Sequence, residues 1–192
     1  MDNLHVLTGA PGSGKTTILD RIGLGIRRVS EPAREILAEQ RAIDGAGTHD
    51  RDPSLFVDLL LRRSIDKYET AQDGEGPTVF DRGVPDCIAY AVLMEIDPTP
   101  SIQAAERYRY NREVLVLAPW EEIYSVDEER TMSFADTITF HAALVDAYER
   151  SGYTLVEVPR DSVGNRASFV RDLISAAPDA SERTGTPRSA PH

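Results

Sequence analysis

The feature that most constrains this sequence is a glycine-rich stretch directly after a short apolar run. Residues 9–16 read GAPGSGKT and fit the phosphate-loop pattern G-x-x-x-x-G-K-[ST] without a mismatch. Apolar residues that include Leu4 and Leu7 precede the motif, and an apolar helical pattern that begins at Ile18 follows it. This context predicts a strand, a tight loop and a helix in that order.

The composition of the loop suits a polyphosphate ligand. Glycine allows backbone angles that a Cβ would obstruct, so consecutive N–H groups can turn toward one anion. We expect Lys15 to reach the β- and γ-phosphates of ATP and the Thr16 hydroxyl to hold Mg²⁺. The residues expected to bind the nucleotide are Gly9, Pro11, Gly12, Ser13, Gly14, Lys15, Thr16 and Thr17.

Length and charge narrow the class of protein. The 192 residues predict one domain over residues 1–176, followed by a disordered tail over 177–192, which is rich in Pro, Ser, Thr, Ala and Arg without periodicity. The net charge of −11 argues against bulk binding to nucleic acid or to an anionic membrane. No apolar run approaches the ~20 residues that span a bilayer. The N-terminus lacks a signal-peptide pattern, and the single cysteine excludes an internal disulfide, so we expect a cytoplasmic protein.

Strand-like and helix-like segments alternate along the chain. Strands are expected near residues 4–7, 27–29, 78–80, 113–117 and 153–158. Helices are expected at 15–24, 33–43, from 53 or 54 to a break at 74–77, 86–94, 102–110, 134–152 and 166–174. This alternation predicts an α/β fold, in which helices cover both faces of a five-stranded parallel sheet. Ligands of such sheets bind at the carboxyl ends of the strands.

Two acidic residues follow expected strands. Glu31 either favours the start of a helix electrostatically or accepts a proton from an attacking hydroxyl beside the γ-phosphate. Asp81 ends the third strand, where P-loop enzymes place the acid that holds Mg²⁺ or its waters. Arg82 is expected either to pair with Asp81 or to grip a substrate, and Asp86 either to cap the next helix or to touch substrate.

One further arginine and one cluster of arginines could place positive charge at the site. Arg130 lies in a strongly charged segment before a long helix, which suits a lid that neutralises the transferring phosphate or a merely solvated surface. Arg107, Arg109 and Arg112 form a basic cluster before the fourth strand, for which solvent or ion pairing is favoured over substrate.

The chain resembles the AAA_28-type P-loop ATPase and kinase domains, which look like small nucleoside and nucleotide kinases with a three-layer sandwich. The residues that carry the resemblance are Gly9 to Thr16, Glu31 to Arg34, Asp81 to Gly83, Pro85-Asp86, Pro119-Trp120, Asp127, Glu129-Arg130 and Gly152-Tyr153.

Two shorter elements are similar to motifs of deoxyribonucleoside kinases. Glu31-Pro32 and Asp81-Arg82 resemble their EP and [DE]R elements, which implies that Glu31 is the general base and Arg82 orients the substrate hydroxyl. Those kinases usually supply several lid arginines, whereas Arg130 is the one clear arginine here. Ser125 stands where the AAA_28 pattern implies a further basic residue.

The sequence therefore predicts an ATP- and Mg²⁺-dependent phosphotransferase that acts on a hydroxyl of a small, nucleoside-like acceptor. The alternative is a slow ATPase that acts as a nucleotide-switched regulatory or partner-binding protein. A polynucleotide 5′-end kinase is disfavoured by the charge of −11. The acceptor, the choice between ATP and GTP and the oligomeric state stay open at this point.

Overall fold

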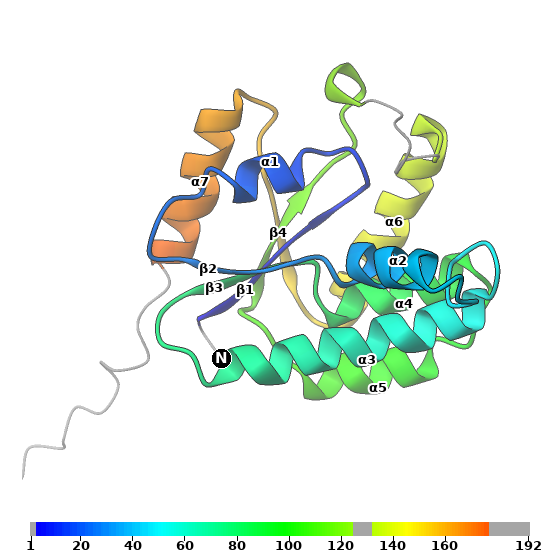
Figure 1. Cartoon of the computed structure of the whole chain (residues 1–192). Helices are drawn as coiled ribbons and strands as arrows, with labels where there is room; N and C mark the ends of the chain where they lie inside the picture. The colour runs from blue at the N-terminus through cyan, green and yellow to red at the C-terminus, as the bar shows by residue number, and fades with distance from the viewer. Residues whose placement is uncertain (1–2, 125–131, 177–192) are drawn as a thin grey trace, which may run out of the picture.

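A five-stranded sheet forms the centre of the molecule (Figure 1). The computed structural model describes residues 3–124 and 132–176. The strands are β1 (Leu4–Gly9), β2 (Arg27–Val29), β3 (Thr78–Asp81), β4 (Glu113–Leu117) and β5 (Thr154–Glu157). Their order is β2-β3-β1-β4-β5, and all neighbours are parallel. The predicted parallel sheet is thus confirmed.

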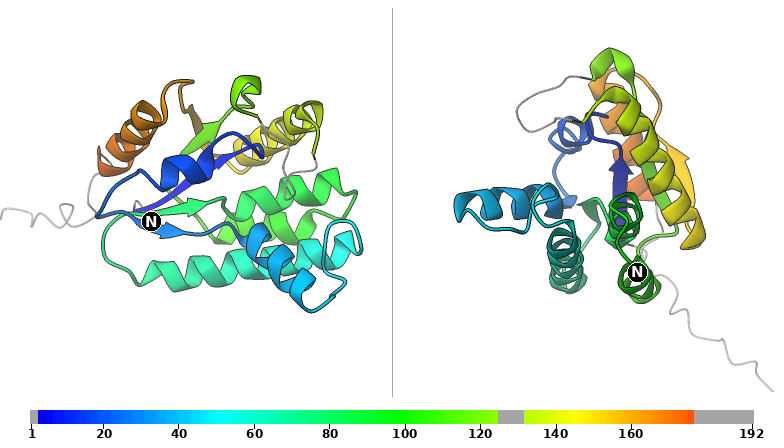
Figure 2. Two further views of the ribbon diagram at one scale, coloured as in Figure 1. Left: turned by 45° about the horizontal axis from the view of Figure 1, so that its top comes forward. Right: turned by 90° about the vertical axis from the view of Figure 1, so that its right-hand side faces the viewer.

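Helices cover both faces of this sheet (Figure 2). They are α1 (Lys15–Leu19), α2 (Pro32–Ala42), α3 (Pro53–Gln72), α4 (Val84–Leu93), α5 (Thr99–Arg107), α6 (Phe134–Arg150) and α7 (Val163–Ala176). A short 3₁₀ turn, η1 (Glu121–Ile123), follows β4. Helices α1 and α7 pack together on one face, and α3 to α6 lie on the other. No helix of the described residues is long and apolar enough to cross a membrane.

The alternation of side chains along each strand divides the core into two layers. Leu7 and Val79 pack with the side chains of α1 and α7, whereas Val6 and Phe80 pack with those of α4 and α6. Successive residues of a strand point to opposite faces, so a strand covered on both sides is mostly apolar. This explains the apolar residues that mark β1, β3 and β4 in the sequence, whereas the edge strand β2 exposes Arg27 and Arg28.

Several helix boundaries differ from the sequence-based expectation, among them those of α7, which spans Val163–Ala176 rather than 166–174. Helix α1 ends at Leu19 rather than residue 24, because Gly23 and Gly25 adopt positive φ and Arg28 donates a hydrogen bond to the Leu19 carbonyl. Helix α4 begins at Val84 rather than residue 86. Helix α5 spans Thr99–Arg107 rather than 102–110. Pro98 is its N-cap, and Pro100 lies in its first turn, where a proline costs no hydrogen bond.

The strand order creates a crevice at the carboxyl edge of β1. Connections from β1 lead first to β2 and β3 on one side and later to β4 and β5 on the other. Such a switch point separates the loops on either side and leaves room for a ligand. The loop after β1 and the turn after β3 therefore meet at one place. The predicted lid residue Arg130 and the predicted tail over 177–192 lie outside the described residues.

Candidate active site

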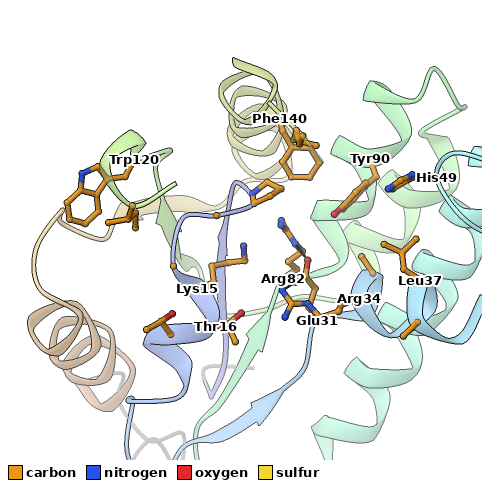
Figure 3. Close-up of a pocket in the computed structure, with 18 of the residues that line it drawn as sticks. Lys15, Thr16, Glu31, Arg34, Leu37, His49, Arg82, Tyr90, Trp120 and Phe140 are labelled. Atoms are coloured by element: carbon orange, nitrogen blue, oxygen red, sulfur yellow. Dashed lines mark hydrogen bonds and ion pairs between the residues drawn. The ribbon is translucent and has the colours of Figure 1, made fainter. Parts of the chain in front are cut away.

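A cavity of about 920 Å³ opens at this carboxyl edge. Figure 3 shows Trp120 at one end, Tyr90 and His49 at the other, and Lys15 and Arg82 between them. Of the predicted site residues, the cavity is lined by Pro11, Gly12, Gly14, Lys15, Thr16, Thr17, Glu31 and Arg82. Gly9, Ser13 and Asp81 are buried beside it and are not among its lining residues.

The phosphate loop depends on glycine at two positions for different reasons. Gly9 has a φ of 144°, and a Cβ there would lie 2.5 Å from the Leu117 carbonyl oxygen, so β1 and β4 could not approach as they do. Gly14 has a φ of 89° in the left-handed region and occupies the N-cap of α1. Both positions therefore require the residue that the motif supplies.

Lys15 points into the loop that it belongs to. Its Nζ donates hydrogen bonds to the Gly9 carbonyl at 3.1 Å and the Ala10 carbonyl at 3.4 Å. Burial, with the nearby charge of Arg82 adding to it, lowers the pKa of Lys15 from 10.5 to about 8. A polyanion in the cavity would offset this cost of burial, because an opposite charge favours the ammonium form.

The donor chemistry next to Lys15 fits a magnesium ion held jointly with phosphates. Asp81 is buried, and its Oδ1 has no hydrogen-bond partner in the described part of the chain. Burial raises the pKa of Asp81, and the charge of Lys15 opposes that shift. Thr16 lines the cavity with its hydroxyl-bearing side chain. Mg²⁺ commonly takes one or two carboxylates and leaves its other positions to water and phosphate. Among the described residues, no group of three or more His, Cys, Asp or Glu could hold a metal by itself.

Arg82 is held from two sides by carboxylates. Its Nε donates to Glu31 Oε1 at 2.7 Å, and its Nη1 donates to Asp86 Oδ1 at 2.9 Å. Arg82 has a φ of 75°, an uncommon conformation for a residue with a Cβ. The sequence left Arg82 either to pair with Asp81 or to grip a substrate. The turn after β3 aims the guanidinium at Glu31 and Asp86 rather than at Asp81, and the contact with a substrate stays a prediction.

Glu31 connects this arginine to the cavity. It occupies the N-cap position of α2, with Pro32 in the first turn, and its side chain is only 15% exposed. Burial raises the pKa of Glu31, but the charges of Arg82 and Lys15 outweigh it and lower the pKa to about 2. Glu31 is therefore a carboxylate at neutral pH, able to accept a hydrogen bond from a hydroxyl in the cavity.

Asp86 is the hub of a buried polar network. Its Oδ1 accepts from Thr8 Oγ1 at 2.7 Å as well as from Arg82, and its Oδ2 accepts from the Gly83 N–H at 2.9 Å and from Tyr148 Oη at 2.6 Å. The network joins β1, the turn after β3, and α6. The expected N-cap role is wrong, because Gly83 is the N-cap and Asp86 is the third residue of the helix, from which its carboxylate accepts a hydrogen bond from the Gly83 N–H.

Arg166 contributes to the site although the sequence pattern did not single it out. Its Nη2 donates to the Ser13 carbonyl at 2.8 Å, and its guanidinium lies 5.4 Å from the Trp120 ring centroid. The side chain is buried, and burial lowers its pKa. The one sequence feature that could have indicated Arg166 is its position in the first turn of α7, the helix that follows β5. The basic cluster before β4 does not line the cavity, and Arg107 and Arg109 lie against tyrosine rings instead.

The phosphate loop at the switch point of a parallel sheet defines a P-loop kinase-like domain. A family model described as AAA domain, the AAA_28 family, matches residues 4–166. The chain therefore belongs to the AAA_28 family, as its motifs predicted.

Three solved structures with the same fold are distant from this chain in sequence. NadR protein in complex with NR superposes with a TM-score of 0.68 at 20% identity, over 91% of this chain and 51% of NadR, so the chain spans about half of that protein. Deoxyadenosine kinase from M. mycoides with bound dATP gives 0.59 at 16% identity, over 90% and 100% of the two chains. Thymidylate kinase from Ehrlichia chaffeensis gives 0.56 at 14% identity, over 89% and 99%. No curated protein matches the chain in sequence.

Proposed function

We propose that this protein transfers the γ-phosphate of ATP to a hydroxyl of a small, nucleoside-like molecule. The observation that carries the proposal is one cavity lined by Lys15 of the phosphate loop and by the ion-paired Glu31 and Arg82. Such a cavity provides for a phosphate donor and a hydroxyl acceptor side by side. Proximity and charge stabilisation account for most of the catalysis in phosphoryl transfer.

Each residue has a proposed role on the donor side. The loop amides and Lys15 bind the phosphates of ATP. Thr16 and Asp81 would hold Mg²⁺, which neutralises phosphate charge when it is bound. Trp120 stands at the end of the cavity beyond the loop, with Arg166 over its ring, and we place the rest of the nucleotide there. Arg130 is proposed as the lid cation that stabilises the transferring group.

Glu31 and Arg82 act on the acceptor side. The acceptor oxygen attacks the γ-phosphorus, the bond from that phosphorus to the β-γ bridging oxygen breaks, and ADP leaves. Glu31 receives the proton of the hydroxyl, while Arg82 orients the acceptor oxygen. A carboxylate with a pKa of about 2 is a weak base. A weak base suffices where the transition state is loose and positioning contributes more than proton abstraction.

The test measures ADP formation with Mg²⁺ and ATP, with and without a panel of nucleosides, cofactor precursors and sugars. We expect at least one acceptor to accelerate ADP formation by tenfold or more. Glu31→Gln should abolish this acceleration and leave the affinity for a non-hydrolysable ATP analogue within twofold. Glu39→Gln, the same change on α2 outside the cavity, should behave like the parent. Slow ADP formation whose rate no acceptor changes would instead favour the nucleotide-switched ATPase.

A further inference from the structure

The part of the cavity beyond Arg82 has an apolar and aromatic wall. Tyr90 and Phe140 meet edge to face there, with ring centroids 4.9 Å apart. Leu37, Leu93 and Met94 also line this part. Figure 3 shows Leu37, Tyr90 and Phe140 on the side of the phosphate loop opposite to Trp120. The wall can take a ring-sized apolar body, because few polar groups there demand hydrogen bonds.

One face of α2 adds charge to this apolar wall. Arg34, Leu37, Ala38 and Arg41 follow the spacing i, i+3, i+4 and i+7, and all four line the cavity. Glu31 lies at the start of the same helix. At 1.5 Å per residue, Arg41 stands about 15 Å along the helix axis from Glu31, and Arg34 about 4–5 Å. The helix therefore presents a carboxylate near the transferable phosphate and a cation far from it.

The charges on this face are not balanced within the described residues. The acidic residues that line the cavity are Glu31, already bonded to Arg82, and Asp161, which follows β5. The Arg34 Nη2 lies 3.8 Å from Glu31 Oε2, and the Arg34 side chain is 49% exposed. Arg41 forms no ion pair with any described residue. Arg41 is an exposed residue in the last turn of α2, where a cation also favours the helix dipole. Its guanidinium therefore lines the cavity with its hydrogen-bond donors available to an anion.

We propose that the acceptor is an anion, with a carboxylate or phosphate group at the end remote from its reacting hydroxyl. Arg41 binds that group and Arg34 assists, while the body of the acceptor lies against Tyr90 and Phe140. This inference rests on the proposed phosphotransfer function and narrows its substrate class. Guanidinium groups suit it because their planar donors match carboxylate and phosphate oxygens in pairs.

The test compares matched anionic and neutral compounds on the full chain saturated with Mg²⁺ and a non-hydrolysable ATP analogue. Calorimetry would measure binding of adenosine against its 5′-monophosphate, thymidine against its 5′-monophosphate, and shikimate against its methyl ester. We expect at least one anion to bind tenfold or more tightly than its neutral partner. The nucleotide pairs report a preference for phosphate, and the shikimate pair reports one for carboxylate.

Variants that remove a positive charge test whether the preference for anions depends on the arginines of α2. Arg41→Gln should cut it by fivefold or more and Arg34→Gln by a smaller factor, whereas Arg62→Gln, an exposed arginine of α3 outside the cavity, should preserve it. Equal binding of anions and neutral compounds, no binding of any anion, or a preference that survives in Arg41→Gln and Arg34→Gln would overturn the inference.

The two proposals fail in different ways. If neutral acceptors accelerate ADP formation and no anion is preferred, phosphotransfer stands and the anionic acceptor is wrong. If anions bind in an Arg41-dependent way but no compound accelerates ADP formation, the anion site stands and phosphotransfer is wrong.

Discussion

At the scale of single residues, the centre of the site is a chain of ion pairs from Glu31 through Arg82 to Asp86. The Arg82 guanidinium is almost completely buried, so its charge must be compensated by these two carboxylates. Arg82 also has aromatic rings as neighbours, with Phe140 at 5.3 Å and Tyr90 at 5.9 Å from its guanidinium carbon. A fixed guanidinium between carboxylates can hold an acceptor oxygen in one orientation.

The depressed pKa of Glu31 predicts an acid-sensitive contribution to stability. A carboxyl whose pKa is about 2 in the folded state and 4.5 in the unfolded state stabilises the fold above pH 4.5. This contribution is lost as the pH falls from 4.5 toward 2, and it is on the order of 3 kcal/mol. Urea unfolding at stepped pH should therefore show a shallower loss of stability in Glu31→Gln than in the parent. Identical pH slopes in the two proteins would contradict the assigned ion pair.

A variant of Asp86 should lose phosphotransfer activity while it keeps its affinity for the nucleotide. Asp86→Asn keeps the shape but removes the charge opposite Arg82 and turns an amide toward its hydrogen-bond donors, so it should destabilise the fold by about 3 kcal/mol. Acceptor-stimulated ADP formation should fall tenfold or more, because Arg82 is no longer held in place. The affinity for an ATP analogue should change by less than twofold.

A matched control for Asp86 is Tyr148→Phe, which removes one charge-assisted hydrogen bond to the same carboxylate but keeps its charge. It should cost about 2 kcal/mol and leave transfer within threefold of the parent, because the charge opposite Arg82 remains. For both variants, urea unfolding measures the stability and an ADP-formation assay measures the acceptor-stimulated rate. Should Asp86→Asn lower stability without lowering that rate, Asp86 would be structural only.

At the scale of elements, the close approach of β1 and β4 places the phosphate loop. Gly9 ends β1 directly opposite Leu117, which ends β4. The first half of the loop therefore starts from a backbone that is fixed by both neighbouring strands. Arg166 of α7 fixes the other half through its hydrogen bond to the Ser13 carbonyl.

Gly9→Ala should test this placement. Its Cβ would meet a backbone oxygen at 2.5 Å, so β4 would have to shift, and we expect a loss of 3 kcal/mol or more from strain and overpacking. Gly76→Ala is the control, because Gly76 also has a positive φ, 76°, but nothing lies within 4 Å of an added Cβ. That variant should lose about 1–2 kcal/mol. Thermal or urea unfolding measures both losses. Equal losses would show that the β1–β4 contact does not determine the cost.

At the scale of the whole molecule, the local parts of the site could be predicted from sequence and the long-range parts could not. The phosphate loop is a contiguous motif, and Glu31 and Arg82 follow recognisable strands. Their positions along the chain were therefore sufficient to place them at the carboxyl edge of the sheet. Asp86 and Tyr148 are 62 residues apart, and Arg166 and Ser13 are 153 apart. Those contacts exist only once the sheet order brings α6 and α7 beside β1, and no local pattern encodes them.

The fold was predictable for a related reason. Apolar runs and glycine- or proline-rich breaks fix the alternation of strands and helices, and that alternation limits the topology to a parallel sheet. Helix ends were less predictable, because they depend on single contacts. The Arg28 hydrogen bond to the Leu19 carbonyl at the end of α1 is one example.

The most direct test of the central claim follows the fate of the phosphate. ATP labelled at the γ-phosphate is incubated with Mg²⁺, the protein and each acceptor that accelerates ADP formation, and the products are separated. The claim of a phosphotransferase predicts that the label moves to the organic acceptor in the parent and not in Glu31→Gln. Label found only as inorganic phosphate, whichever acceptor is present, would contradict it.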